Sequence, residues 1–374
     1  MKRLSVIFLT LFMFQLYGQT EQDLYVETQS GYESNILRAP NSFIEDGVQM
    51  GPDEIQLSSF YQEVDIRGLI TRSWGPHKFS VRLQPKGRFY FSEGDASYYT
   101  VYSRLRYENE LNRNTRWLLT ARYNFRDRDG NNLDDNELLT PLGYGHLEFS
   151  SGLFFRMYPQ NRSFIEVRYA NRDYTDGEVN DLKYDLFGVD AVIRNVFKRP
   201  EGYHSYGIET GFSNRQYTRT FVDPEEPATV RNWNYFYAEG FYRYPVTREL
   251  RIRPGFRYMI RTDTDTGRFS YSEIRPSVEI SYNGERFSAD FNASYVDRTF
   301  DQLRAVDTDN NDLGRLQFQY LRLRLDLEHA ITDNLALVGT FYMNNRESNR
   351  TRETSLLFRS YNYNYSGIGL RFTL

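Results

Sequence analysis

A stretch of fourteen residues, KFSVRLQPKGRFYF at 78–91, separates apolar from cationic side chains two residues at a time. Its odd positions carry mainly Phe, Val and Leu, and its even positions carry mainly Ser, Arg, Gln and Lys. A period of two indicates a β-strand, because successive side chains of a strand point to opposite faces. Ordinary strands run about five or six residues, whereas a tilted strand that crosses a bilayer needs roughly 9 to 11. The stretch therefore favours a strand that spans a membrane.

The same alternation recurs along the chain, with an apolar face set against an arginine-rich face. It is found at 99–108, 117–126, 147–157, 250–261 and 321–328. Around 182–197 and 233–244 both faces carry rings or aliphatic side chains, so the pattern leaves their facing open. Pro85, Pro254 and Pro276 fall inside predicted strands, where each removes a ladder hydrogen bond, and we expect a bulge or bend at each.

The connections between these segments alternate between tight turns and longer polar loops. Seven tight turns are predicted, at 74–77, 112–115, 159–162, 199–202, 245–248, 283–284 and 332–334. Eight loops fall between them, at 36–54, 92–97, 127–143, 173–182, 216–232, 263–268, 299–314 and 346–356. Fifteen connections join sixteen strands, an even number with both ends on the tight-turn side. The sequence thus predicts an all-β fold, a transmembrane antiparallel up-and-down β-barrel of about 16 strands. The last strand pairs with the first, roughly 22–35, because an unpaired edge would invite aggregation.

The N-terminus reads as a secretory signal peptide, residues 1–18, with a cut between 18 and 20. Lys2 and Arg3 precede a short apolar run that ends at Phe14. Residues 19–374 then form a single outer-membrane β-barrel domain. No later apolar run approaches the 18 or more residues of a membrane helix, but a barrel hides its apolar band in every second residue. The chain has no cysteine, which excludes a disulfide framework, and its 31 Tyr and 28 Phe suit a membrane–water boundary.

The signal peptide, the alternating hairpins and the apolar last strand resemble those of Gram-negative outer-membrane β-barrel proteins of the porin-like kind. The resemblance covers the mature chain in pattern and also includes the stretch GYESN at 31–35. It implies that the terminal strand, through Ile368, Leu370, Phe372 and Leu374, is the signal read by the barrel-assembly machinery. That group usually ends in an aromatic residue, whereas this chain ends in leucine. The resemblance carries no catalytic motif.

If the apolar positions of each strand face lipid, the alternate positions of the strand line the lumen with basic side chains. The lumen set is Arg82, Lys86, Arg88, Arg104, Arg106, Arg122, Arg126, Arg168, Arg251, Arg253, Arg257, Arg261, Arg275, Arg322, Arg324 and Arg371. Eight carboxylates oppose these sixteen bases: Glu108, Glu110, Glu148, Glu166, Glu279, Asp290, Asp326 and Glu328. One interpretation is structural, with bidentate Arg–carboxylate ladders between strands. The other is functional, with a cationic excess that favours anions in a water-filled channel. The selectivity residues we predict are Arg82, Arg104, Arg106, Arg122, Arg257 and Arg324.

Three acidic loops place aspartates two residues apart: Asp127 and Asp129, Asp263 and Asp265, and Asp307 and Asp309. Such oxygen ligands suit a divalent cation, although solvated loop tips favour aspartate as well. Hydrolase, metalloprotease and phosphate-loop motifs are missing, and His146 and Ser150 would lie about 14 Å apart along one strand, at about 3.4 Å per residue. We therefore expect no enzyme and no cofactor. Nucleic acid is not expected either, because the basic residues are dispersed inside the wall.

The sequence favours a porin-like channel in the cell outer membrane for passive diffusion of small polar or anionic solutes. Its partners would be outer-membrane lipid, the assembly machinery and those solutes. The alternative is a plugged structural or surface-interaction barrel whose external loops bind a partner. A third possibility is a soluble secreted β-sandwich, perhaps one that binds sugars.

Overall fold

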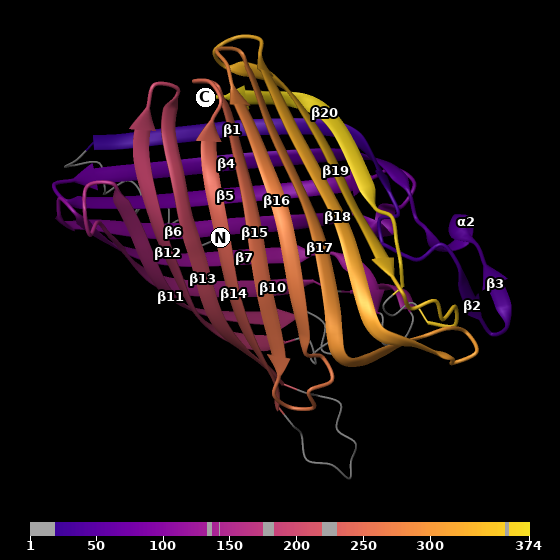
Figure 1. Cartoon of the computed structure of the whole chain (residues 1–374). Coiled ribbons are helices and arrows are strands. Elements are labelled where there is room, and N and C mark those ends of the chain that lie inside the picture. The colour runs from indigo at the N-terminus through magenta and orange to yellow at the C-terminus, as the bar shows by residue number, and fades with distance from the viewer. Residues whose placement is uncertain (1–18, 133–136, 142, 175–182, 219–229, 356–358) are drawn as a thin grey trace, which may run out of the picture.

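Sixteen antiparallel strands close into a single barrel in the computed structural model (Figure 1). The structure describes residues 19–132, 137–141, 143–174, 183–218, 230–355 and 359–374. The predicted signal peptide, residues 1–18, lies outside the described residues. The barrel strands are β1 (Gln19–Ser34), β4 (Ser59–Trp74), β5 (His77–Tyr90), β6 (Tyr98–Asn112), β7 (Thr115–Asp127), β10 (Tyr144–Phe155), β11 (Asn161–Tyr174), β12 (Tyr184–Arg199), β13 (Gly202–Thr218), β14 (Val230–Pro245), β15 (Leu250–Asp263), β16 (Tyr271–Asn283), β17 (Phe287–Val306), β18 (Asp312–Ala330), β19 (Leu335–Ser348) and β20 (Asn364–Thr373). The predicted fold class and strand number are confirmed.

The barrel closes where the first strand meets the last. β1 pairs with β4 on one side and with β20 on the other, with Val26 opposite Phe372 and Gly31 opposite Gly367. The predicted pairing of the terminal strands is therefore confirmed, and neither strand is left with an open edge.

Glycines at this closure are required by a close approach of backbone. A Cβ built on Gly369 would meet the Thr28 carbonyl oxygen at 1.9 Å, and one on Gly31 would meet the Ser366 carbonyl oxygen at 2.1 Å. The Tyr61 ring lies against Gly31 and Gly367, and its hydroxyl donates to the Ser366 carbonyl at 3.2 Å.

The structure corrects three of the predicted loops. The 36–54 loop contains the hairpin β2 (Phe43–Glu45) and β3 (Val48–Met50) and the short helix α2 (Pro52–Ile55), which has a small core of its own formed by Ala39, Phe43 and Ile55. The 127–143 loop contains the hairpin β8 (Asp129–Asn132) and β9 (Glu137–Pro141). Most of 299–314 is strand, because β17 continues to Val306 and buries Phe300, Leu303 and Ala305 against β18. A single 3-10 turn, η2 (Gly94–Ala96), lies in the β5–β6 loop.

The three prolines within strands are accommodated without a change of register, contrary to the expected bulges. Beside Pro85 the β4–β5 ladder passes from Asp65↔Lys86 to Gly68↔Leu83, so two pairs are skipped and the register is kept. The same interruption occurs beside Pro254 in β14–β15 and beside Pro276 in β16–β17. Each proline interrupts the ladder on one side of its strand only, and pairing continues on the other side.

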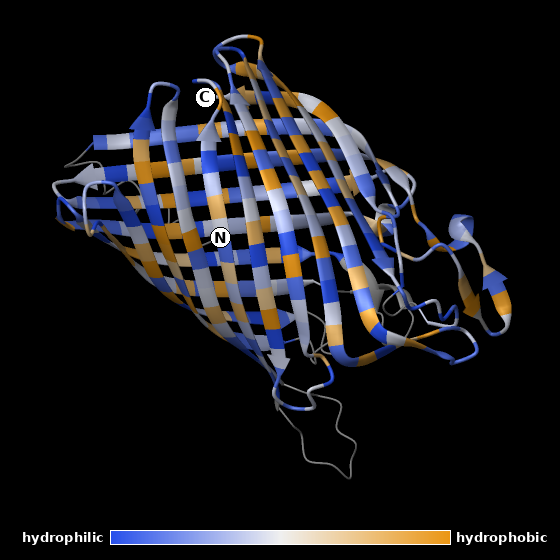
Figure 2. Ribbon diagram, viewed as in Figure 1, coloured by the Kyte–Doolittle hydropathy of each residue, from blue (hydrophilic) through white to orange (hydrophobic). Residues whose placement is uncertain are grey.

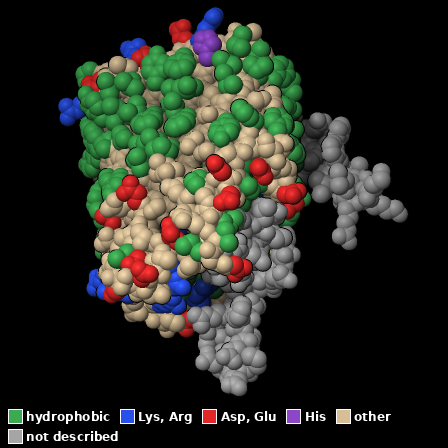
Figure 3. Space-filling view, turned by 90° about the vertical axis from the view of Figure 1, so that its right-hand side faces the viewer, with side chains coloured by type: hydrophobic (Ala, Val, Ile, Leu, Met, Phe, Trp, Pro, Cys, Tyr) green, Lys and Arg blue, Asp and Glu red, His purple; other side chains and the backbone are tan. Residues whose placement is uncertain are grey.

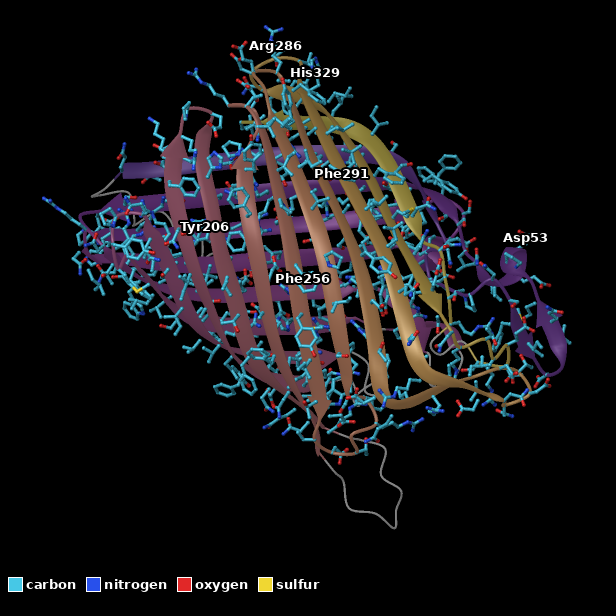
Figure 4. All side chains as sticks on the ribbon, in the orientation of Figure 1. Asp53, Tyr206, Phe256, Arg286, Phe291 and His329 are labelled. Carbon is cyan, nitrogen blue, oxygen red and sulfur yellow. The ribbon has the colours of Figure 1, made fainter. Side chains whose placement is uncertain are left out.

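Hydrophobic and hydrophilic residues alternate along the barrel strands, as the sequence predicts (Figure 2). The outer face carries exposed apolar residues such as Leu105, Tyr206 and Phe256, and Figure 4 shows Tyr206, Phe256 and Phe291 on the outside of β13, β15 and β17. In Figure 3 hydrophobic side chains form a broad band over the upper part of the visible face, and charged side chains lie at its top edge and over its lower part. Within the described ranges, no helix has the length and apolar content needed to cross a bilayer.

The two ends of the barrel differ. Arg286 and His329 mark the end with the short turns, and Asp53 on α2 marks the end with the long loops (Figure 4). In barrels of this kind the short turns lie in the periplasm and the long loops lie outside the cell.

Candidate functional site

The six arginines predicted to set selectivity lie on the inward parity of their strands, opposite to exposed residues such as Leu105, Leu119 and Phe256. Three of them form a row. Arg82 on β5 is the register partner of Arg104 on β6, and Arg104 is the register partner of Arg122 on β7. Three like charges side by side repel one another. Glu148 on β10 forms an ion pair with Arg122 and so compensates its charge. Arg82 instead donates to Gln84 and lies 5.4 Å from the Tyr102 ring centroid. Among the described residues, neither Arg82 nor Arg104 forms an ion pair.

The other three predicted arginines are held by carboxylates. Arg106 contacts Glu108 at 2.8 Å, Arg324 contacts Asp326 at 2.5 Å, and Arg257 contacts Glu239 at 2.7 Å. Glu239 is nearly buried and is also approached by Arg253 and Arg275, both at 3.3 Å. The Glu239 contacts cross between strands, as the first interpretation expects, whereas Arg106 and Arg324 pair with a carboxylate two residues along their own strand.

The prediction of eight inward carboxylates against sixteen bases was too low for the carboxylates. The sequence pattern missed those on β1, β4, β12–β14 and β16. The missed residues that accept from inward donors are Glu27, Glu33, Glu63, Asp65, Asp190, Glu209, Glu239 and Glu273. Some of these carboxylates lie in strands whose two faces both carry rings or aliphatic residues, so the sequence did not show which side chains point inward. These carboxylates compensate much of the predicted excess, whereas Arg82 and Arg104 of the row have no carboxylate partner among the described residues.

Arg88 is the centre of a buried network near the outer end. Its guanidinium contacts Glu63 at 2.6 Å and Glu33 at 2.5 Å, and all three side chains are at most 5% exposed. The Tyr61 and Tyr365 ring centroids lie 4.1 and 4.6 Å from it. Tyr90 and Tyr363 each donate a hydroxyl to Glu33. Because this network joins β1, β4, β5 and β20, it stabilises the strand closure rather than offering a charge to solutes.

A belt of alternating guanidinium and aromatic groups follows the inner wall across the neighbouring strands β10 to β18. Each arginine of this arginine–aromatic belt lies within 6 Å of a ring centroid on its own or an adjacent strand, a cation–π distance. Its members are Tyr144, Arg172, Tyr184, Arg215, Tyr217, Arg231, Trp233, Arg261, Tyr271, Arg298 and Tyr320. Sequence analysis missed the belt, although rings and arginines share the inward parity near the strand ends.

The start of the first loop folds against the inner wall at the outer end. Ile36 and Leu37 pack on the inward rings Tyr61, Tyr90 and Tyr365. Asn35 holds the segment closed by accepting from the Ala39 amide at 2.7 Å and donating to the Ala39 carbonyl at 2.8 Å. Asn35 and Arg38 both adopt positive φ, of 51° and 58°. Residues 35–39 therefore narrow the outer mouth of the lumen.

Below this segment the lumen contains open space lined by polar groups. A cavity of 520 Å³ extends along the wall from β17 through the closure to β5, with Glu63, Lys86, Arg324 and Arg371 among its lining residues. A second cavity, of 450 Å³, lies beside the Glu239 cluster. Sixteen-stranded barrels are wide enough to keep water inside.

The remaining predicted residues are placed as follows. Ile368, Leu370, Phe372 and Leu374 point outward and are exposed, while recognition of this strand by assembly machinery stays a prediction. The three aspartate pairs lie at separate places: Asp127 ends β7, Asp263 ends β15, and Asp307 lies in the β17–β18 loop. Asp263 accepts from Thr266 and the Phe269 amide, Asp307 accepts from Asn311, and the side chain of Asp129 lies outside the described residues. Within the described part of the chain, no three His or acidic side chains gather as a metal site, so divalent binding also stays a prediction.

His146 and Ser150 share the inward face of β10, and His146 lies 4.0 Å from Glu148.

Comparison with known proteins gives likeness in overall fold only. No protein-family profile matches the chain, and no curated protein sequence matches it. Solved structures that align over most of the chain include a loop L8 deletion mutant of OmpT, an outer membrane protein of Vibrio cholerae, at 9% identity and a TM-score of 0.43, covering 95% of this chain and 99% of that one. A bacterial polysaccharide outer membrane secretin aligns at 13% identity and a TM-score of 0.46, covering 94% and 98%. The siderophore receptor PirA from Acinetobacter baumannii aligns at 7% identity and a TM-score of 0.42, covering 96% and 81%.

The closed barrel and its apolar outer band define the class of protein. A sheet without edges and with an outward hydrocarbon face satisfies every requirement for crossing a bilayer with strands. The chain is an outer-membrane β-barrel protein, located in the cell outer membrane.

Proposed function

We propose that this barrel is a porin-like channel for passive diffusion of small polar or anionic solutes. The observation that carries the proposal is the row formed by Arg82, Arg104 and Arg122, in which two of the three guanidinium groups have no carboxylate partner in the described part of the chain. The proposal contains no catalytic step.

The chemistry of the row suits attraction of anions. Uncompensated positive charge on a low-dielectric wall raises the local concentration of anions, because the field is focused into the lumen. An anion that passes about 7 Å from one guanidinium in water gains about 0.6 kcal/mol. One unpaired arginine therefore changes the local anion population about threefold, and a row of two changes it more.

Residues 35–39 favour small solutes over large ones. The segment packs on inward tyrosines and is pinned by Asn35, so it acts as a fixed constriction at the outer mouth. The inward packing of the same segment also favours the second candidate function. In that function the barrel is plugged and serves as a surface-interaction protein. In that case α2 and the β2–β3 hairpin, which project beyond the barrel end in Figure 1, would present the binding surface.

Single-channel recording in planar bilayers tests the proposal. Under a KCl gradient, the reversal potential of the wild-type channel is expected to indicate anion preference. The Arg104→Gln variant should lower the chloride-to-potassium permeability ratio at least about threefold, because chloride loses an attraction and potassium loses a repulsion. Arg286→Gln, which removes a charge from a turn outside the lumen, is the matched control and should leave the ratio unchanged. Absence of conductance would favour the surface-interaction barrel, and equal ratios for both variants would exclude the row as the selectivity element.

A further inference from the structure

A second basic site lies on the inner wall at the opposite, short-turn end of the barrel. There a cavity of 540 Å³ is bounded by the ends of β6, β7, β10, β11 and β12 and by the turns between them. We call it the periplasmic pocket and define it by Arg116, Phe154, Arg156, Arg162, Phe164 and Arg194. Sequence analysis singled out none of these residues, because the turns around them read only as turn chemistry.

The floor of the periplasmic pocket is apolar, which is unusual for the inner face of this barrel. Phe154 and Phe164 are register partners on β10 and β11, and their rings stack with centroids 4.3 Å apart. Gly152 leaves room for Phe164, since a Cβ at that glycine would come within 2.6 Å of the ring. Val192, opposite Phe164 on β12, extends the floor.

The rim of the periplasmic pocket concentrates positive charge. Arg162 and Arg194 are direct register partners on β11 and β12, an arrangement of like charges that costs free energy. Arg156 adds a third charge, which acts on Arg162 together with Arg194. Among the described residues, none of these three guanidinium groups forms an ion pair, in contrast to the cluster around Glu239.

Three features bear on this charge. Glu110, near the end of β6, lines the cavity but forms no ion pair with a described residue. Arg116 lies 3.6 Å from Glu108 and 5.4 Å from the Phe154 ring centroid, so it joins the rim to the apolar floor. Arg162 donates to the carbonyl oxygens of Pro159 and Asn161, which fixes its guanidinium without neutralising it. The rim therefore keeps its positive charge and part of its geometry in the absence of any bound anion.

We propose that the periplasmic pocket binds organic anions that carry a flat apolar group, taken up from the periplasmic side. The stacked phenylalanines provide the surface for the flat group. Arg156, Arg162 and Arg194 provide forked donors for a phosphate, sulfonate or carboxylate, and a bound anion removes the repulsion between Arg162 and Arg194. The site opens on the short-turn side and does not depend on conduction through the outer mouth.

Isothermal titration of the full-length barrel in neutral detergent tests this site with phenyl phosphate as the probe. Phenyl phosphate should bind saturably and at least about tenfold more tightly than inorganic phosphate, which lacks the ring, or phenol, which lacks the charge. Arg194→Gln should weaken phenyl phosphate binding about tenfold, the equivalent of one charged hydrogen bond. Phe164→Leu should weaken phenyl phosphate but leave inorganic phosphate unchanged. Arg248→Gln removes a charge from a different periplasmic turn and should change neither.

Equal affinities for wild type and for the Arg162→Gln/Arg194→Gln double variant would overturn the proposal, as would wild type that binds phenyl phosphate no better than phosphate. Gel mobility of unheated samples shows whether each variant is folded, and the single variants remain informative where the double variant is not. A barrel that does not conduct but binds phenyl phosphate would refute only the channel proposal. A conducting barrel without this binding would refute only the periplasmic pocket.

Discussion

The buried Arg88 network allows a sharp test of how the closure is stabilised. Replacement of Arg88 by methionine keeps most of the aliphatic volume but leaves Glu33, at 1% exposure, without its cation, and leaves Glu63, at 5% exposure, with Lys86 alone. Removing one partner from a buried ion pair costs about 3–5 kcal/mol, because the other charge remains buried and unpaired. Loss of the stacking contacts with Tyr61 and Tyr365 adds to this cost.

Arg324→Met is the matched control for this substitution. Arg324 is 52% exposed and its partner Asp326 is 35% exposed, so water solvates the carboxylate after the arginine is removed. An exposed pair of this kind contributes about 0–1 kcal/mol. We therefore expect the free energy of unfolding to fall at least about 2 kcal/mol further in Arg88→Met than in Arg324→Met.

Urea unfolding in phospholipid vesicles, followed by the fluorescence of the three tryptophans, measures the difference. The triple variant Arg88→Met/Glu33→Gln/Glu63→Gln should recover part of the loss, because no buried carboxylate then lacks a cation and Lys86, at 33% exposure, stays solvated. Equal destabilisation by Arg88→Met and Arg324→Met, or a triple variant less stable than Arg88→Met, would refute the reasoning.

Two further predictions concern the closure and a loop tip. Gly369→Ala should destabilise the barrel by about 1–3 kcal/mol, because its Cβ would meet the Thr28 carbonyl, whereas Gly68→Ala, with open space around it, should be nearly neutral in the same urea titration. At the β17–β18 tip, hydrogen bonds from Asn311 hold the pKa of Asp307 below its usual value. The tip should therefore be ordered above that usual value, about 3.9, and should lose order as the pH falls through the lower folded-state pKa. The protection of the Asn311 amide against exchange, relative to its intrinsic rate at the same pH, measures this loss. Asp307→Asn should remove the pH dependence of that protection.

The number and order of strands could be predicted because two signals agreed. Turn chemistry such as the Asn283–Gly284 pair marked the short connections, and alternation marked the strands between them. Strand ends were harder to predict. Thr299–Val306 reads as a polar loop, yet it continues β17 because Phe300, Leu303 and Ala305 find apolar partners on β18, which local sequence does not reveal.

The lumen could be predicted in kind but not in detail. Parity identified Arg82, Arg104 and Arg122 as inward, but their lateral alignment depends on the register between strands, which no single strand encodes. The inward fold of residues 35–39 depends on positive φ at Asn35 and Arg38 and on rings from distant strands. The periplasmic pocket likewise exists only because five strand ends meet.

The central claim is that neighbouring residues of one strand face water and lipid in turn, and thiol labelling tests it most directly. The chain has no cysteine, so each introduced thiol is the only one present. In proteoliposomes, the Arg104→Cys variant should react rapidly with an anionic, membrane-impermeant methanethiosulfonate, and the Leu105→Cys variant should stay unmodified. Rapid reaction at position 105 with protection at position 104 would contradict the account.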